Sequence, residues 1–219
     1  VDGHSVYECR KSCGRQLASE SNVQADMVIP VPDSGVPAAI GYAEESQIPF
    51  ELGITRNHYV GRTFIEPKQS IRSFSVKLKH NANQYLVKNK KVILVDDSIV
   101  RGTTSKKIVE MVRNAGAKEV HLRIASPPTT HSCFYGVDTP DRKELIAANN
   151  DTEKIRKEIN VDSLAFISIN GLYRAMGLEY TEKESFYCDA CFTGNYAITL
   201  TDILGGDTSK QLSLLSESN

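Results

Sequence analysis

Apolar residues along this 219-residue chain gather in short continuous runs, and stretches with a helical period separate these runs. Short apolar runs predict buried strands, whereas apolar residues three and four positions apart predict helices. Strands are expected at residues 26–31, 50–55, 91–95 and 119–125. Helices are expected at residues 5–20, 36–45, 71–87, 103–115, 152–159 and 168–176. This alternation predicts an α/β fold, a mostly parallel sheet flanked by helices, with a C-terminal helical extension from about Asp141.

The length suits one domain, which we place at residues 1–200 with the helical extension included. Residues 201–219 are rich in Ser, Thr, Gly and Asp, and this composition predicts a loose polar tail. Residues 57–70 lack a clear period and contain Gly61 and Pro67, so a long loop is expected there.

The charge balance narrows the range of partners. The chain has 26 Lys and Arg against 27 Asp and Glu, a net charge of −1, which predicts binding neither to nucleic acid nor to a membrane surface. No apolar run approaches the roughly 20 residues that span a bilayer. No signal-like segment opens the sequence, so a cytoplasmic location is expected.

Residues 92–105, VILVDDSIVRGTTS, carry the strongest chemical signal. An apolar strand runs directly into Asp96 and Asp97, and ligands of parallel sheets bind at the carboxyl ends of strands. The next residues begin a helix, whose backbone N–H groups and hydroxyls suit a phosphate. Substrate contacts are expected from Ser98, Arg101, Gly102, Thr103, Thr104 and Ser105. Taken alone, these residues also have a structural interpretation, in which Asp96 and Asp97 end a strand and Thr103 caps a helix.

The acid pair also restricts the ligand. Two carboxylates beside a phosphate pocket would repel it unless they met donors, and ribose hydroxyls or bound Mg²⁺ would supply those. A second turn fits the same ligand, because the strand at 26–31 leads into Pro32 and then Asp33, Ser34 and Gly35 before a helix. Such a turn presents successive N–H groups to an anion. It is also a common structural turn, so alone it is a weak signal.

The string at 92–105 resembles the phosphoribosylpyrophosphate-binding motif of type I phosphoribosyltransferases. Residues 56–65, RNHYVGRTFI, resemble the flexible catalytic loop of the glutamine phosphoribosylpyrophosphate amidotransferases, with His58 as a departure from that pattern. The likeness extends over nearly the whole chain, from Asp2 to about Tyr196. It implies a type I phosphoribosyltransferase fold, with Tyr59 and Arg62 catalytic beside Asp96 and Asp97.

The resemblance also implies an activity, displacement of pyrophosphate from phosphoribosylpyrophosphate by ammonia, the first step of de novo purine synthesis. It implies Mg²⁺ held by Ser34, Asp96 and Asp97, purine nucleotides as feedback inhibitors, and a homo-oligomer, a tetramer in relatives. The family takes ammonia from glutamine in an amino-terminal glutaminase domain whose terminal Cys is the nucleophile. Nothing in these 219 residues matches that domain, so ammonia-dependent activity is expected from this chain. The alternatives are a nucleobase phosphoribosyltransferase and a non-catalytic regulator that binds phosphoribosylpyrophosphate.

Five cysteines are an odd number, which favours ligation or burial over a disulfide framework. Cys188 and Cys191 form a Cys-x-x-Cys pair, a modest signal by itself. The resemblance is to the branch of the family that carries a 4Fe–4S cluster, and there Cys133, Cys188 and Cys191 match three ligands. The fourth lies upstream in the family, and Cys9 and Cys13 do not match it; their spacing of one helical turn suits packing.

Overall fold

A computed structural model describes residues 3–57, 80–181 and 186–198. Its centre is a sheet of four parallel strands in the order β1-β4-β5-β6. The strands are β1 (Met27–Pro30), β4 (Lys91–Asp96), β5 (Glu119–Ile124) and β6 (Ser163–Phe166). The longer helices are α1 (Val6–Glu20), α2 (Val36–Ser46), α5 (Thr103–Asn114), α7 (Thr152–Ile159) and α8 (Ile169–Ala175). Short elements are α4 (Gln84–Val87), η2 (Arg142–Glu144), α6 (Ile146–Asn149) and α9 (Ala190–Thr193).

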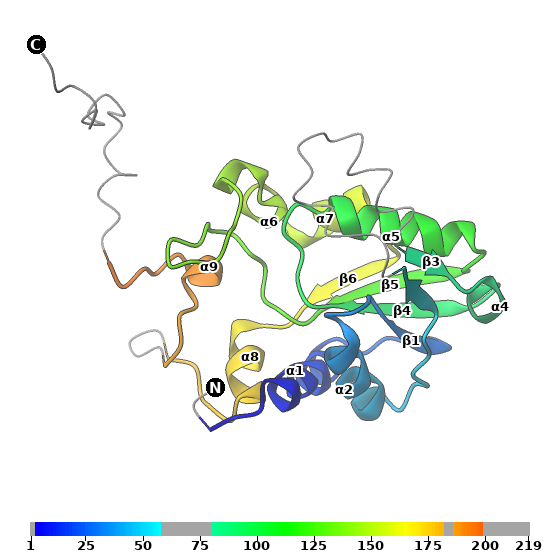
Figure 1. The fold of residues 1–219 in the computed structure, drawn as a ribbon, viewed down its shortest axis with the longest axis horizontal. Coiled ribbons are helices and arrows are strands. Elements are labelled where there is room, and N and C mark those ends of the chain that lie inside the picture. Colours follow the sequence, from blue (N-terminus) through cyan, green and yellow to red (C-terminus); the bar gives the residue numbers. More distant parts are fainter. Residues whose placement is uncertain (1–2, 58–79, 182–185, 199–219) are drawn as a thin grey trace, which may run out of the picture.

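Helices cover both faces of this sheet (Figure 1), because its strands are apolar on both sides. Along β4, Val92 and Leu94 pack into a core beneath α5 and α7. The alternate residues Ile93 and Val95 pack into a second core beneath α1, α2 and α8. Successive side chains of a strand point to opposite faces, so one apolar run serves both cores. The predicted parallel sheet flanked by helices is confirmed.

The strand β6 corrects the sequence prediction, which treated everything after about Asp141 as helical. Residues 163–166 pair in parallel with β5, and Phe166 lies opposite Ile124. All four residues of β6 are only half-buried, since the strand forms the edge of the sheet. A four-residue run of this kind, Ser-Leu-Ala-Phe, has no β-branched residue to mark it as a strand.

A separate antiparallel ribbon joins β2 (Ile54–Arg56) to β3 (His80–Ala82). The helix predicted at 71–87 is therefore wrong at 80–82, and only α4 in that range is helical among the described residues. The alternate burial of His80 and Ala82 is the pattern of a strand with one covered face. The strand predicted at 50–55 is shorter than expected, and Phe50 makes only an isolated bridge to Val28. Residues 58–79, with Gly61 and Pro67, and the tail at 199–219 lie outside the described part.

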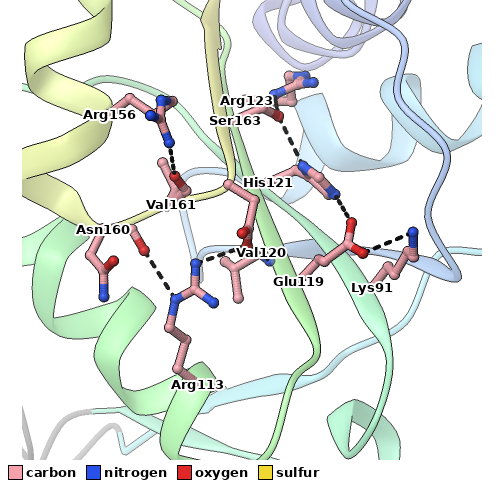
Figure 2. Close-up of polar contacts among 11 residues, drawn as sticks. Lys91, Arg113, Glu119, Val120, His121, Arg123, Arg156, Asn160, Val161 and Ser163 are labelled. Atoms are coloured by element: carbon pink, nitrogen blue, oxygen red, sulfur yellow. Dashed lines mark hydrogen bonds and ion pairs between the residues drawn. The ribbon is translucent and has the colours of Figure 1, made fainter.

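Charged side chains at the amino-terminal edge of the sheet form a connected network (Figure 2). Asp162 accepts hydrogen bonds from the Val120 N–H at 2.7 Å and from Arg113 Nη2 at 2.8 Å. His121 Nδ1 lies 2.9 Å from Ser163 Oγ, and its Nε2 lies 3.4 Å from a Glu119 carboxylate oxygen. These contacts join the starts of β5 and β6 to the end of α5.

An ion pair and a further hydrogen bond extend the network. Lys91 pairs with Glu119 at 2.9 Å across β4 and β5, and Arg123 Nη1 donates to Ser163 Oγ at 3.0 Å.

None of the helices within the described residues is long and apolar enough to cross a membrane.

Candidate active site

A cavity of about 530 Å³ opens at the opposite edge of the sheet, where the strands end. The side chains and backbone that line it come from the ends of β1 and β4, from β3 and from the start of α5. Its walls include Ser34, His80, Asp96, Asp97, Ser98, Arg101, Gly102, Thr103, Thr104, Ser105 and Lys107. The structure therefore brings nine residues predicted from sequence into one cavity, as expected for the carboxyl edge of a parallel sheet.

The acid pair lies at the floor of this cavity. Asp96 is 7% exposed and its carboxylate accepts a hydrogen bond from the Asp97 N–H at 2.9 Å. Burial and the neighbouring charge of Asp97 raise the pKa of Asp96 well above the ordinary value of a carboxyl group. Ser98 Oγ donates to Asp97 at 3.2 Å. Within the described residues neither carboxylate has a cationic partner, so the pair is electrostatically incomplete.

The start of α5 is open toward the cavity. Gly102 occupies the N-cap position with φ +74°, and no side chain caps the helix there. A Cβ at Gly102 would lie 2.7 Å from Ile146 Cδ1, so both the backbone conformation and the space favour glycine. Thr103 and Thr104 are exposed in the first turn. The alternative role of Thr103 as a helix cap is not what the structure shows, and the first-turn N–H groups remain available to an anion.

Arg101 departs from the simple expectation that its side chain faces a phosphate. Its Nε donates to Glu144 at 2.8 Å, and both side chains are partly exposed. The ion pair joins the turn after β4 to η2. Arg101 therefore contributes to the cavity wall while its guanidinium is paired with a carboxylate of the protein.

The turn after β1 packs closely against β4. The Val31 N–H donates to the Val95 carbonyl at 2.8 Å, and the Gly35 N–H donates to the Val31 carbonyl at 3.0 Å. A Cβ at Gly35 would lie 2.4 Å from the Val95 oxygen, so this position requires glycine. Ser34 lines the cavity, whereas Gly35 is buried behind it. The carboxylate of Asp33 forms an ion pair with Arg56.

Two polar residues of the cavity were not identified from the sequence. Lys107 lies one turn beyond Thr103 on α5, so the helical period could have pointed to it. His80 begins β3, and nothing local marks it, because it reaches the cavity only through the pairing of β3 with β2. The predicted catalytic residues Tyr59 and Arg62, together with His58, lie outside the described residues.

A second cavity of about 340 Å³ meets the first at Ser34 and Asp97, which line both. It lies between α1, α2 and α8, and Cys9 and Cys13 contribute to its wall. Burial and the neighbouring Cys9 raise the pKa of the Cys13 thiol to about 11. Cys13 is only 7% exposed, which agrees with the predicted packing role.

The three other cysteines approach one another at α9. The Thr130 and His131 N–H groups both donate to the Cys191 carbonyl at 3.0 Å, which brings the segment with Cys133 beside the Cys-x-x-Cys pair. Burial and the neighbouring thiols of Cys133 and Cys188 raise the pKa of Cys191. Across the described ranges, however, no group of three or more His, Cys, Asp or Glu side chains is arranged to hold a metal ion.

Comparisons with known proteins agree with this geometry. The family model described as phosphoribosyl transferase domain matches residues 11–126. The amidophosphoribosyltransferase of Rhizobium etli is 57% identical over 218 residues, which cover 99% of this chain and 44% of that protein. The amidophosphoribosyltransferase of Bacillus subtilis is 53% identical over 196 residues, which cover 90% of this chain and 41% of that protein.

A solved structure, the glutamine phosphoribosylpyrophosphate amidotransferase from B. subtilis complexed with ADP and GMP, superimposes with a TM-score of 0.80 at 52% identity. The match covers 90% of this chain and 43% of that one. The chain thus spans less than half the length of the relatives that it matches. Since the family model covers more than half of its residues, the chain belongs to the phosphoribosyl transferase family and has the type I fold of that family.

Proposed function

We propose that this chain is the phosphoribosyl-transferring part of an amidophosphoribosyltransferase. It displaces pyrophosphate from phosphoribosylpyrophosphate with ammonia and gives 5-phosphoribosylamine, which opens de novo purine synthesis. One observation carries the proposal: an acid pair, of which Asp96 is buried, and an open helix N-terminus share one cavity at the carboxyl edge of the sheet. The similarity to relatives with that name, 57% and 53% identical, supports the choice among phosphoribosyltransferases.

The start of α5 holds the 5-phosphate. Its first-turn N–H groups and the exposed hydroxyls of Thr103 and Thr104 supply donors, and the helix dipole favours a dianion there. Gly102 begins the helix with a positive φ and without a side-chain cap, so the first-turn N–H groups stay available to the phosphate. Because Arg101 is paired with Glu144, backbone and hydroxyl donors carry most of this contact.

Asp96 and Asp97 bind the ribose diol and Mg²⁺. Two adjacent carboxylates that form no ion pair with the described residues are ligands that Mg²⁺ and sugar hydroxyls fit, and Ser34 adds a hydroxyl to the same cavity. When bound, Mg²⁺ neutralises charge on the pyrophosphate. The carboxylates then lie where negative charge stabilises a cationic, oxocarbenium-like anomeric carbon, so no covalent nucleophile is required.

The departing pyrophosphate meets the turn after β1, where Ser34 lines the cavity. The loop at 56–65, with Tyr59 and Arg62, is predicted to close over it and to exclude water from the reacting carbon. Ammonia attacks the anomeric carbon as pyrophosphate leaves, and these 219 residues, assayed by themselves, are expected to take free ammonia. The structure of the B. subtilis relative was solved with ADP and GMP. We extend the proposal to purine nucleotides as inhibitors of this chain, and to a homo-oligomer.

A 4Fe–4S cluster belongs to the same proposal for the intact enzyme. Cys133, Cys188 and Cys191 lie near one another, although within the described residues they are not arranged as a metal site, and a cubane takes a fourth ligand besides these three. The cluster would cross-link the segment at Cys133 to α9. Anaerobic reconstitution with iron and sulfide tests this: bound iron and visible absorbance that are lost on Cys191→Ser support it, and no bound iron in a protein with all four ligands contradicts it.

The activity is tested by Mg²⁺-dependent release of pyrophosphate from phosphoribosylpyrophosphate, with ammonium, glutamine or adenine as the only acceptor. Release with ammonium, lost in Asp97→Asn, is the expected result. Release with adenine in place of ammonium would mean a nucleobase phosphoribosyltransferase. Tight binding of phosphoribosylpyrophosphate without release from any acceptor would mean a binding protein and would contradict the enzymatic role. Release with glutamine alone would contradict the dependence on free ammonia.

A further inference from the structure

The turn that is proposed to receive pyrophosphate contains an acidic residue, and the charge is of the wrong sign for that ligand. Asp33 precedes Ser34 in the turn, and its side chain is 56% exposed. An uncompensated carboxylate beside a pyrophosphate would weaken binding by repulsion between like charges. A residue in that position needs a compensating partner if the turn is to hold an anion.

The structure supplies that partner in Arg56. The Arg56 guanidinium donates from Nη1 to Asp33 Oδ2. Arg56 ends β2, and its backbone lies opposite His80, which lines the phosphoribosyl cavity. The ion pair therefore links the turn after β1 to the β2–β3 ribbon, and a neighbour of each partner, Ser34 and His80, lines the cavity.

The contact with Asp33 uses one nitrogen of the Arg56 guanidinium and leaves its other hydrogen-bond donors to other acceptors. An Arg side chain has five N–H donors in a planar fork. Among the described residues Asp33 is its one hydrogen-bond acceptor, and its buried Nε has none. A buried donor without an acceptor is costly, and a ligand oxygen would relieve that cost. The Arg56 side chain is 25% exposed, so it is not closed off from solvent.

We propose that Asp33 is a positioning residue, which acts on pyrophosphate through Arg56 by fixing the guanidinium fork beside the turn after β1. The inference rests on the proposed function and refines the role of Asp33 as a substrate contact. Arg56, held by one amino group, then presents its remaining donors to two pyrophosphate oxygens. Its positive charge lies between the carboxylate and the ligand and offsets their repulsion.

For Asp33→Asn, the inference predicts a change in pyrophosphate binding that is opposite in direction to the change expected from charge alone. Asp33→Asn removes a negative charge from an anion site, so charge alone predicts tighter binding of pyrophosphate. The positioning role predicts weaker binding, by about tenfold, because the fork loses the charge-assisted hydrogen bond that orients it. Arg56→Lys keeps the charge but removes the fork, and a similar loss is expected.

The test measures binding of magnesium pyrophosphate by calorimetry to the wild type, Asp33→Asn, Arg56→Lys, Arg56→Gln and the double variant Asp33→Asn with Arg56→Gln. If Asp33 acts through Arg56, the double variant binds no more weakly than Arg56→Gln alone. In steady-state kinetics, Asp33→Asn should raise the KM for phosphoribosylpyrophosphate about tenfold and leave kcat within about twofold, since the contact exists before the transition state.

The ion pair of Asp26 with Lys90 provides a matched control. It is also partly exposed, at 3.7 Å, but it lies at the amino-terminal edge of the sheet, and Asp26→Asn should leave pyrophosphate binding unchanged. Unchanged or tighter binding by Asp33→Asn would overturn the inference, and so would additive losses in the double variant. A wild type that binds neither pyrophosphate nor phosphoribosylpyrophosphate would instead overturn the proposed function, so the two failures are distinguishable.

Discussion

At the amino-terminal edge of the sheet, charged side chains form ion pairs within the protein. At the carboxyl-terminal edge, the acid pair of Asp96 and Asp97 has no cationic partner among the described residues. Asp162 and Asp96 illustrate the contrast, since Asp162 directly precedes β6 and Asp96 is the last residue of β4. The Asp162 carboxylate accepts hydrogen bonds from the Val120 N–H and from the Arg113 guanidinium. The Asp96 carboxylate accepts the N–H of its neighbour Asp97 and forms no ion pair with any described residue.

The pKa values of these two carboxyl groups are shifted in opposite directions. Burial alone would raise the pKa of Asp162, but the hydrogen bond from Val120 and the Arg113 charge lower it below the ordinary value. Burial and the charge of Asp97 raise the pKa of Asp96 instead. A satisfied charge stabilises the fold, whereas an unsatisfied charge destabilises the empty protein and favours a ligand that completes it. The edge that costs stability is therefore where function is expected.

Asp96→Asn should cause the largest change in activity, and it tests the difference between the two edges of the sheet most directly. Activity with ammonium should fall about 100-fold or more, because an electrostatic group that stabilises the transition state is lost. The free energy of unfolding of the empty protein should rise at neutral pH, since the buried charge is removed. Activity and thermal unfolding, measured on the same preparation, check both parts.

The pH dependence of this change has a definite sign. A carboxyl group whose folded pKa is raised contributes stability that is present below its ordinary pKa and is lost as the pH rises through the folded value. The stabilisation of Asp96→Asn over the wild type should therefore be largest at neutral pH and should shrink toward pH values of about 4. A variant that is inactive and also less stable at neutral pH would contradict this account of the acid pair.

Asp162→Asn should have the converse effect at the other edge. The free energy of unfolding should fall by about 1 kcal/mol, a modest loss because the ion pair with Arg113 is partly exposed to solvent. The ratio kcat/KM should stay within about twofold, because the amino-terminal edge lies across the sheet from the cavity. Urea unfolding and steady-state kinetics measure the two quantities, and Arg113→Gln should match Asp162→Asn. A large loss of activity without a loss of stability would show that the two edges are not independent.

The acid pair and the start of α5 could be predicted because their information is local. Asp96, Asp97 and Thr103 follow one apolar strand within a few residues, and the rule for parallel sheets places the strand end at the binding edge. The same reasoning located β1, β4 and β5 and the helices between them. These elements are long or fully buried, so their patterns are strong.

The features that escaped prediction depend on pairing between distant segments. His80 reaches the cavity because β3 pairs with β2, and no residue near it signals that pairing. The contact of Asp33 with Arg56 likewise joins the turn after β1 to the end of β2, 23 residues further along the chain. The strand β6 is short and only half-buried at the edge of the sheet, where the apolar pattern is weakest.

The smallest expected effect concerns His121, the titratable centre of the network at the amino-terminal edge. Burial, and then repulsion by Arg123, lower its pKa, although Asp162 and Glu119 favour the charged form. A histidine with a lowered folded pKa contributes stability that is present above its ordinary pKa of about 6.5 and is lost as the pH falls through the folded value. The loss should stay below about 1.4 kcal/mol for each pH unit.

His121→Gln should therefore flatten the fall in the free energy of unfolding between about pH 7 and pH 5, while binding of pyrophosphate at the far edge stays unchanged. Denaturant unfolding of both proteins at several pH values measures the two slopes. Equal slopes would mean that His121 is not the group that titrates in this range. A change in pyrophosphate binding would mean that the network at the amino-terminal edge acts on the site as well as on stability, and the contrast between the edges would then no longer hold.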